Sequence, residues 1–391
     1  MKEDFNRLRL KHHGDPEMMQ KILQLECRSK TASKLPETLK CQDFIFPSLA
    51  VAEMSTSDAV AEIHASFIPD GADVLDMTFG LGIDSFHFAG RARKVTAIEF
   101  NPETFKAGTH NIKALGLENL TLEEGESIRW LRDHGDYCFD VIFIDPARRD
   151  NAGRHYALKD CQPDIIPALP MLLSRCRRLI IKASPMLDIK KAIAELGVSC
   201  DVITTGTVKE CKELIFLIDT DRICQENQAP SRLSTNCLTV GRQAYSFTPE
   251  EENNAAPTYS APIAGGVLLE PFPSVMKGGG LKLLSERFGT GKLHPNTSLF
   301  CADEQAEDFP GEYFRIIEVL PFNKQTVKNF AKTYPVVNVA VRNFPLGAPQ
   351  LAAKLKIKEG GDSMIFGTTA SGDQKLLIVT SMGQVCQRRG C

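Results

Sequence analysis

The sequence contains no uninterrupted apolar run of the ~18 residues that a membrane-spanning helix needs. The opening residues, MKEDFNRLRLKHHGD, also lack the apolar segment of a secretory signal peptide. We therefore expect a cytoplasmic protein. Hydrophobic residues make up 43% of the 391 positions, which is enough to build packed cores, and the length favours two or three domains.

Metal-ligand and disulfide patterns are missing as well. The twelve cysteines are scattered and form no Cys-x-x-Cys pair, which argues against a zinc knuckle and a disulfide framework. The histidines show no metal-ligand spacing, so no metal is expected. A net charge of −3 argues against an indiscriminate nucleic-acid binder. Residues 263–391 nevertheless hold 15 Lys and Arg against 11 Asp and Glu, so the C-terminal part is mildly basic.

Predicted strands and helices alternate through residues 51–220, which we interpret as one α/β domain. Such alternation indicates a parallel sheet covered by helices on both faces. The last two strands are joined around Gly206 and predict a terminal antiparallel pair. The expected strands cover residues 73–77, 94–98, 120–122, 139–144, 178–182, 198–205 and 213–218.

The rest of the chain divides into three parts. Residues 1–50 are predicted to be helical, with Asp15-Pro16 as a helix start. The composition of residues 221–262 predicts a linker with extended structure, in which residues 237–240 and 244–248 are candidate edge strands. Residues 263–391 are expected to form a second α/β module.

Two helix predictions depend on local signals. Ser55 and Asp58 are expected to open a helix in capping-box style, after the N-terminal segment. In the C-terminal module a single helix is expected over residues 274–288, with a local bend at its three glycines. Two further helices are expected over 324–333 and 349–354.

The segment from Asp73 to Ser85 reads as a strand, a glycine turn and a helix, the first half of a nucleotide-binding βαβ unit. Gly80 and Gly82 lie in the turn, where a residue without Cβ lets the backbone approach a ligand or adopt positive φ. Asp76 ends the strand. Its carboxylate would repel the pyrophosphate of a dinucleotide but attract the cationic groups of S-adenosylmethionine. The sequence therefore favours the methyl donor, with a nicotinamide cofactor as a remote alternative.

Acidic residues follow four successive predicted strands, at the edge where open α/β sheets bind ligands. They are Asp76, Glu99, Glu126 and Asp145. We expect Asp76 to attract the methionyl end of the donor, Glu99 to accept both ribose hydroxyls and Glu126 to accept from the adenine amino group. Any one of these acids taken alone fits a helix cap or a solvated turn equally well.

Asp145 opens the motif Asp145-Pro-Ala-Arg-Arg149. In methyltransferases that modify exocyclic amines of bases, an acid or amide at this place is followed by two prolines and an aromatic ring. Arg148 replaces that ring here, and its guanidinium is suited to stack on a base or pair with a phosphate. Tyr156 is a candidate for the missing ring. Lys182, after the fifth strand, faces the same cleft as a substrate contact or a snorkelling edge lysine.

The chain resembles bacterial class I S-adenosylmethionine methyltransferases that carry a C-terminal THUMP-like domain. The matching motifs are Asp76-x-Thr-Phe-Gly-Leu-Gly-Ile-Asp84, Glu99, Asp145-Pro-Ala-Arg-Arg149, Lys182-Ala-Ser-Pro-x-Leu-Asp188, Glu270-Pro-x-Pro273, His294-Pro-Asn-Thr297, Leu320-Pro-Phe-Asn323 and Lys34-Leu-Pro36. The resemblance implies a Rossmann-like doubly wound sheet of seven strands with an antiparallel last pair. It also implies S-adenosyl-L-methionine as cofactor and RNA, such as tRNA or rRNA, as partner.

The predicted site follows from the motifs and the resemblance together. The catalytic candidates are Asp145, Pro146 and Arg148. The cofactor-binding candidates are Asp76, Thr78, Phe79, Gly80, Gly82, Asp84, Ser85, Glu99, Asn101, Glu126 and Asp145. The substrate-binding candidates are Arg148, Arg149, Tyr156 and Lys182.

Three hypotheses for the function follow. The first is methylation of a base in RNA, at an exocyclic amine. The second is a donor-binding and RNA-binding module without catalysis, since the motif after Asp145 lacks its ring. The third is methylation of a protein or a small molecule.

Overall fold

The computed structural model describes residues 4–135, 137–148, 157–223, 229–382 and 384–385. The chain forms two compact units. The first comprises residues 1–201 and 213–231, and the second comprises residues 202–212 and 232–391. Among the described residues, no helix is long and apolar enough to cross a membrane.

The N-terminal segment is helical, as predicted. It contains α1 (Phe5–Lys11), α2 (Pro16–Thr31), the short η1 (Thr38–Lys40) and α3 (Leu49–Met54). Asp15 caps α2 and accepts from the backbone N–H of Met18 at 3.0 Å. An apolar cluster that includes Leu35, Phe44 and Phe46 packs this segment against Leu81, which lies just before α5 in the same unit. The segment therefore shares a core with the α/β domain.

The prediction of a cap at Ser55 was wrong. The helix that follows, α4 (Asp58–Ala65), is capped by Ser57, whose hydroxyl accepts from a backbone N–H one turn later. Asp58 is buried, and its carboxylate accepts from the backbone N–H groups of Glu37 and Thr38. The Asp58 carboxylate therefore joins α4 to the N-terminal segment and is not part of a capping box.

The first unit is built on parallel strands. These are β1 (Asp73–Asp76), β2 (Lys94–Glu99), β3 (Leu120–Glu124), β4 (Phe139–Ile144) and β7 (Cys176–Ala183). β1 pairs with β2 and β4 in parallel, β2 pairs with β3, and β4 pairs with β7. β9 (Cys211–Asp219) is antiparallel to β7. β1 and β4 are buried almost throughout, as expected where helices cover both faces of a sheet, whereas the edge strand β3 is partly exposed.

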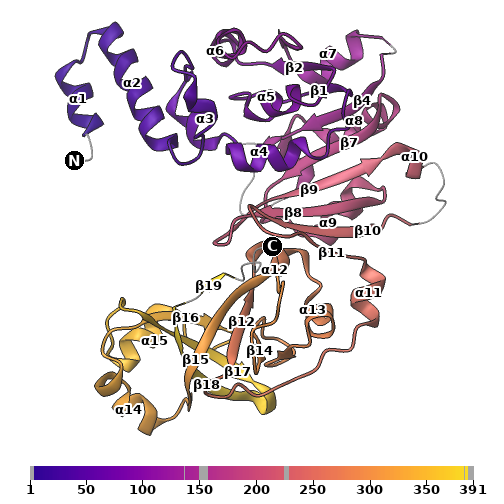
Figure 1. Ribbon diagram of the computed structural model, residues 1–391. Coiled ribbons are helices and arrows are strands. Elements are labelled where there is room, and N and C mark those ends of the chain that lie inside the picture. The colour runs from indigo at the N-terminus through magenta and orange to yellow at the C-terminus, as the bar shows by residue number, and fades with distance from the viewer. Residues whose placement is uncertain (1–3, 136, 149–156, 224–228, 383, 386–391) are drawn as a thin grey trace. The chain divides into compact units, whose positions relative to one another are not determined.

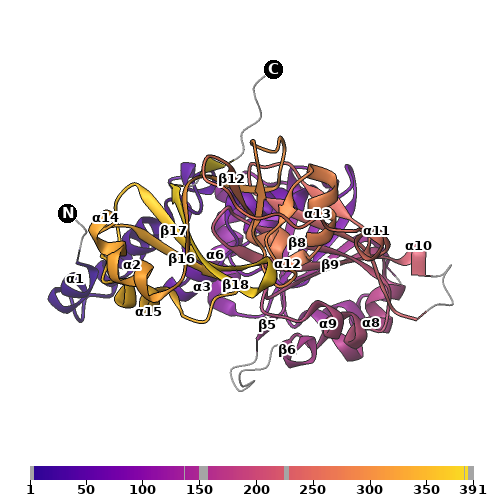
Figure 2. The ribbon, with the colours of Figure 1, turned by 90° about the horizontal axis from the view of Figure 1, so that it is seen from below.

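The whole sheet has nine strands in the order β11-β10-β8-β9-β7-β4-β1-β2-β3 (Figure 1). Strand order reverses at β1 and the final pair, β8 (Cys200–Gly206) and β9, is present, so the predicted doubly wound class I arrangement is confirmed. The predicted number of seven strands was too small, because β10 and β11 from the expected linker extend the sheet to nine. The connecting helices are α5 (Ile83–Ala89), α6 (Pro102–Ala114), α7 (Ser127–Asp133), α8 (Ile165–Ser174) and α9 (Ile189–Leu196). Helices α8 and α9 lie side by side (Figure 2).

The remaining elements of the first unit are short. They are β5 (Ala147–Arg148), η2 (Leu158–Asp160), β6 (Cys161–Gln162) and α10 (Thr220–Ile223). β5 and β6 form an antiparallel pair that starts directly after Asp145 and Pro146. The motif at the end of β4 thus leads out of the sheet into a small ribbon.

The segment 221–262, predicted as a linker, contains regular structure. β10 (Arg232–Thr239) and β11 (Tyr245–Phe247) pair in antiparallel fashion, and α11 (Pro249–Asn254) follows. Cys237, Tyr245 and Phe247 are buried in the apolar core of the second unit. Polar residues alternate with these apolar ones along the strands, so the average composition hides the pattern of a half-buried sheet.

The second unit contains its own sheet, in the order β13-β14-β12-β15-β18-β17-β16, with β19 paired to β15. Its strands are β12 (Val267–Pro271), β13 (Gly291–Lys292), β14 (Phe300–Ala302), β15 (Gly311–Pro321), β16 (Asn338–Arg342), β17 (Ser363–Ala370), β18 (Gln374–Ser381) and β19 (Gln384–Val385). Helices α14 (Lys324–Thr333) and α15 (Ala348–Leu355) pack on each other, and the short η3 (Ser371–Asp373) precedes β18.

The prediction of one helix over 274–288 was wrong, because the chain forms α12 (Pro273–Gly278) and α13 (Leu281–Phe288). Gly279 and Gly280 between them have φ values of +93° and +77°, which favour glycine. A Cβ on Gly280 would lie 2.6 Å from the ring of Phe247. Gly279 ends α12 at positive φ, and Gly280, packed against that ring, begins α13. The apolar periodicity alone does not show this break.

Candidate functional site

The carboxyl ends of the parallel strands bring the predicted acids to one edge of the sheet. Asp76 ends β1 and Glu99 ends β2. Asp145 directly follows β4, and Lys182 lies near the end of β7. Because these strands run in the same direction and are neighbours, the four side chains gather at the edge where open α/β sheets bind ligands.

Asp76 is completely buried and holds the glycine turn. One carboxylate oxygen accepts from the Ser85 hydroxyl at 2.6 Å, and the other accepts from the backbone N–H of Thr78 at 2.9 Å. Burial raises the pKa of this carboxyl to about 7, although both hydrogen bonds oppose the shift. Asp76 therefore changes charge near neutral pH, next to the turn that it shapes.

At Gly82 the glycine turn has no room for a side chain. Gly82 has a φ of +87°, and a Cβ there would lie 2.3 Å from the ring of Phe79. The Phe79 ring is buried, and a Cβ on Gly108 of α6 would meet it at 2.5 Å. Phe79 therefore acts as the packing core under the turn, and both glycines are required by its ring.

Glu99 joins the turn to the end of β2. Its carboxylate accepts from the backbone N–H of Gly80 at 2.9 Å and from that of Asn101 at 2.8 Å. Burial raises the pKa of this carboxyl. The Asn101 side chain is engaged as the N-cap of α6, where its oxygen accepts from two backbone N–H groups. Glu99 therefore fixes the separation between β1 and β2 at the predicted donor site.

Glu126 is exposed and serves as the N-cap of α7. Its two carboxylate oxygens accept from the backbone N–H groups of Ile128 and Arg129 at 3.0 and 2.8 Å. This is the helix cap that fits any single acid after a strand. Its contact with adenine stays a prediction.

Asp145 connects the glycine turn with β7. Its backbone N–H donates to the Thr78 hydroxyl at 2.7 Å, and its carboxylate accepts from the Lys182 ammonium group at 2.8 Å. The Asp145 side chain remains 41% exposed, whereas that of Lys182 is 11% exposed. Lys182 thus holds one oxygen of the Asp145 carboxylate, while part of the Asp145 side chain stays exposed at the edge of the sheet.

Lys182 belongs to a closed ring of five polar side chains. Its ammonium donates to the Thr56 hydroxyl at 2.9 Å, which in turn donates to Asp84 at 2.7 Å. The other oxygen of Asp84 lies 2.7 Å from Nδ1 of His64. Nε2 of His64 contacts Glu213, and the second oxygen of Glu213 lies 3.6 Å from the Lys182 ammonium. Asp145 is attached to the ring through Lys182.

The buried charges of this ring set each other's protonation. Burial alone would lower the pKa of His64, but Glu213 and Asp84 raise it to about 9. Burial opposes the charge of Lys182 too, yet Asp145, Asp84 and Glu213 raise its pKa. The pKa of Asp84 is lowered by His64 and Lys182 in spite of burial. Two cations therefore face three carboxylates, and the surplus of negative charge favours a cationic ligand nearby.

Some predicted residues lie outside what the structure describes. Arg149 and Tyr156 fall in the segment 149–156, and for Arg148 only the backbone, in β5, is described. Pro146 is half-buried between Asp145 and β5. The predicted substrate contacts of the two arginines and the tyrosine are therefore not tested.

Sequence reasoning missed Thr56, His64 and Glu213 of the ring, and also Phe100. His64 carried a signal, since it lies four residues after Val60 on the apolar face of α4. Phe100 directly follows Glu99 and is 74% exposed next to the predicted donor site. Thr56 and Glu213 carried no local signal, because only the fold brings them to Lys182.

Comparisons with known proteins agree with this geometry. Residues 268–310 match a ferredoxin-like domain, and residues 311–382 match a family described as THUMP domain-like. The structure is similar to one from Porphyromonas gingivalis W83 that is assigned as a methyltransferase. The TM-score is 0.84 and the identity 28%, over 97% of this chain and 94% of that chain. The chain is a class I S-adenosylmethionine-dependent methyltransferase with a C-terminal THUMP-like domain.

Two relatives match very different shares of this chain. An uncharacterised S-adenosylmethionine-dependent methyltransferase of Mycobacterium tuberculosis H37Rv is 22% identical over 361 residues, 90% of this chain and 93% of that protein. Ribosomal RNA small subunit methyltransferase J of Marinobacter nauticus is 32% identical over 81 residues, 19% of this chain and 29% of that protein. The methyltransferase likeness is thus spread along the chain, whereas the likeness to an RNA enzyme is local.

Proposed function

We propose that this methyltransferase transfers the methyl group of S-adenosylmethionine to an exocyclic amine of a base in RNA. The observation that carries the proposal is the Asp145 carboxylate, which is half-exposed at the sheet edge and held by Lys182 and, through its backbone, by Thr78. Within the described residues, only Lys182 contacts this carboxylate, at Oδ2. Oδ1 is the natural acceptor for an amine hydrogen.

The donor would lie against the glycine turn. Thr78, Phe79, Gly80 and Gly82 provide the backbone that approaches it, and Asp84 and Ser85 support that turn from buried positions. The lone pairs of Glu99 not used by Gly80 and Asn101 would accept from the ribose hydroxyls. The exposed ring of Phe100 offers an apolar face for the adenine.

The chemistry needs position more than it needs a strong base. The amine nitrogen attacks the methyl carbon in line with the carbon–sulfur bond, which breaks and leaves a neutral thioether. Positive charge moves from sulfur to nitrogen. Asp145 stabilises that charge, and the nitrogen then loses its proton to Asp145 or to water. Lys182 acts through Asp145 by holding its carboxylate in one orientation.

RNA as the substrate class is supported by three observations. The C-terminal part matches a THUMP-like domain, local relatives carry RNA methyltransferase names, and the same part of the chain is basic. The pure protein should be incubated with donor labelled in its methyl group and with total RNA, total protein or small-molecule extract from the source cells. We expect label in RNA, as an amino-methylated nucleoside in the digested product. Label in protein or in a small molecule would contradict RNA, and tight donor binding without any transfer would favour a module without catalysis.

A further inference from the structure

A groove between α14 and α15 forms a basic concave surface in the second unit. It has a volume of about 550 Å³ and is lined by Phe322, Asn323, Lys324, Val327, Lys328, Ala331, Lys354, Leu355 and Lys356. Four of these nine residues are lysines, and none is acidic. The volume lies within the ~300–1,000 Å³ of typical ligand pockets. All nine lie inside the second unit, so the groove is complete within it.

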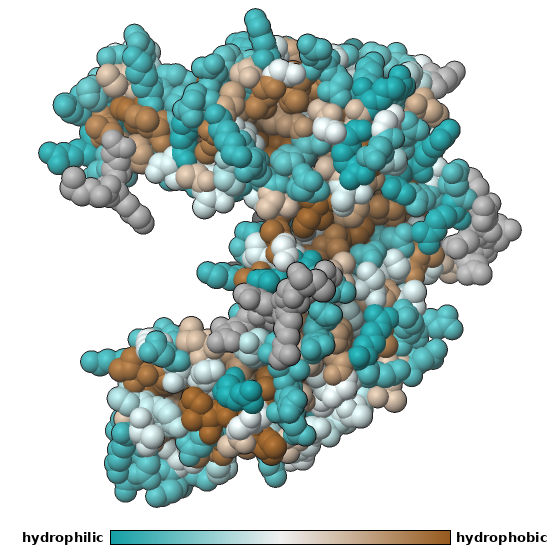
Figure 3. Space-filling model, in the orientation of Figure 1, coloured by the Kyte–Doolittle hydropathy of each residue, from teal (hydrophilic) through white to brown (hydrophobic). Residues whose placement is uncertain are grey.

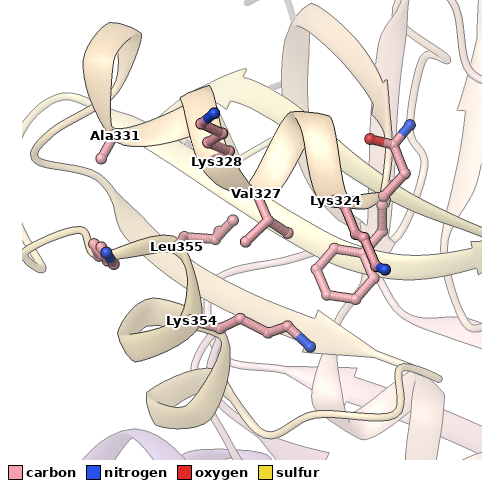
Figure 4. A pocket seen from close by; sticks show the side chains of 9 residues that line it. Lys324, Val327, Lys328, Ala331, Lys354 and Leu355 are labelled. Atoms are coloured by element: carbon pink, nitrogen blue, oxygen red, sulfur yellow. The ribbon is translucent and has the colours of Figure 1, made fainter.

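The walls of the groove are charged and its floor is apolar. Lys324 and Lys354 extend from α14 and α15 toward the same side, with Val327 and Leu355 between the two helices (Figure 4). The Lys354 ammonium group lies 5.4 Å from the centre of the half-buried Phe322 ring. In Figure 3, hydrophilic residues lie over α14, at the lower left, beside apolar residues near α15. A ligand with both anionic and apolar groups matches such a surface.

Acidic residues are missing from the stretch of sequence that builds the groove. Residues 319–358 contain seven Lys and Arg and no Asp or Glu. None of the four lining lysines forms an ion pair with any part of the chain that the structure describes. Lys324, Lys328 and Lys332 are spaced four residues apart on one face of α14, and like charges at that spacing disfavour a helix. An external anion would balance this local charge.

We infer that this groove binds the phosphodiester backbone of a single-stranded segment of the RNA, with a sugar or an unpaired base against the apolar floor. The inference rests on the proposed function for its choice of RNA as the anion. A flexible strand fits a concave surface, exposes its bases, and carries regularly spaced charges that lysines pair without sequence selectivity. The groove would then recruit the substrate, while Asp145 in the first unit carries out the transfer.

The test uses a fluorescein-labelled, mixed-sequence single-stranded RNA and the full chain. The variant combines Lys324→Gln, Lys328→Gln and Lys354→Gln, all at exposed positions where folding should be preserved. The matched control combines Lys11→Gln, Lys94→Gln and Lys113→Gln, which remove equal charge from exposed positions of the first unit. Affinity is measured by anisotropy between 0.05 and ~1 M salt, since each phosphate contact to a single strand contributes a slope of about −0.7 in log K against log salt.

We expect the variant to lose about two units of slope and therefore about 100-fold in affinity near 0.1 M salt, with little difference near 1 M. The control should bind as the wild type does. Equal affinity and slope for variant and wild type would overturn the groove as the site and leave the proposed reaction untouched. Displacement of the probe by polyglutamate as readily as by unlabelled RNA of equal charge would overturn RNA as the occupant.

Transfer assays separate this inference from the proposed function. If the groove recruits RNA, the triple variant should raise the KM for RNA while kcat is unchanged. Asp145→Ala should bind the probe normally and fail in transfer. A wild type that binds RNA through the groove but never methylates it would contradict the proposed reaction alone.

Discussion

His64 gives the most quantitative test of the polar ring. Its pKa is about 9 in the folded protein and 6.5 as the ordinary value, so the folded state binds the proton more tightly than the unfolded state does. That stabilisation is fully present below pH 6.5 and is lost as the pH rises through about 9. The difference corresponds to about 3 kcal/mol of the free energy of unfolding.

His64→Gln removes the charge that titrates. The free energy of unfolding should be measured in urea between pH 6 and ~10 for wild type and variant, with the fluorescence of Trp130 as the signal. Trp130 is the one tryptophan of the chain and lies in α7 of the first unit. Subtracting the two profiles cancels the other titrating groups, and the wild type should lose about 3 kcal/mol more than the variant across this range.

Two further proteins make the result decisive. His13→Gln changes an exposed histidine and should follow the wild-type profile. His64→Gln combined with Glu213→Gln removes one positive and one negative charge, so the net charge of the ring is unchanged. This double variant replaces the single variant if the single variant does not fold. Parallel pH profiles for the wild type and both His64 variants would refute the reasoning, because His64 would then carry no extra proton in the folded state.

The other predictions concern the donor site. Glu99→Ala removes the acceptor for the ribose hydroxyls, and charge-assisted hydrogen bonds contribute about 1.5–3 kcal/mol each, so calorimetry should show at least a tenfold loss of donor affinity; unchanged affinity would remove Glu99 from the site. Gly82→Ala places a Cβ 2.3 Å from the Phe79 ring at positive φ and should lower the free energy of unfolding in urea by about 2 kcal/mol or more. Gly71→Ala, whose Cβ would have nothing within 4 Å, is the control for positive φ alone. Because the pKa of Asp76 is about 7, donor affinity should rise as the pH increases from 6 to 8 and this carboxylate ionises; Asp76→Asn should abolish that rise, and a rise that survives would assign it to another group.

The positions of the central strands along the chain were predictable because each signal was local. The apolar runs of β1 and β4, the glycines after β1 and the acids at strand ends are all contained in short stretches of sequence. Asp145 also shows this, since its position after the four apolar residues 141–144 already places it at a sheet edge. Such features depend on nearest neighbours and on the right-handed alternation of strand and helix.

The parts that could not be predicted depend on distant neighbours. Gly280, at the start of α13, must be glycine because the ring of Phe247 occupies the space that a Cβ would need. Asp58 holds the N-terminal segment because the backbone N–H groups of Glu37 and Thr38 donate to its carboxylate. The same reason hides the ring around Lys182. Glu213 and His64 are 149 residues apart in sequence, and only the pairing of β9 with β7 brings that carboxylate to the histidine.

The role of Glu126 shows the limit of an argument from strand ends. Its position after β3 predicted a donor contact, but both carboxylate oxygens cap α7. An acid at a strand end is also an acid at a helix start whenever the connection is short, and the sequence does not distinguish the two roles. For Glu99, by contrast, the buried carboxylate at the glycine turn keeps the predicted role physically reasonable.

The central claim is that Asp145 orients an amine of RNA for methyl transfer. Single-turnover transfer from labelled donor to the identified RNA should be measured for wild type, Asp145→Asn and Asp145→Ala, with donor affinity determined in parallel. The rate should fall in that order, by about 10²–10³ for Asp145→Ala, while donor affinity changes little because the interaction is made mainly in the transition state. Asp145→Ala that methylates the RNA as fast as wild type would contradict the account.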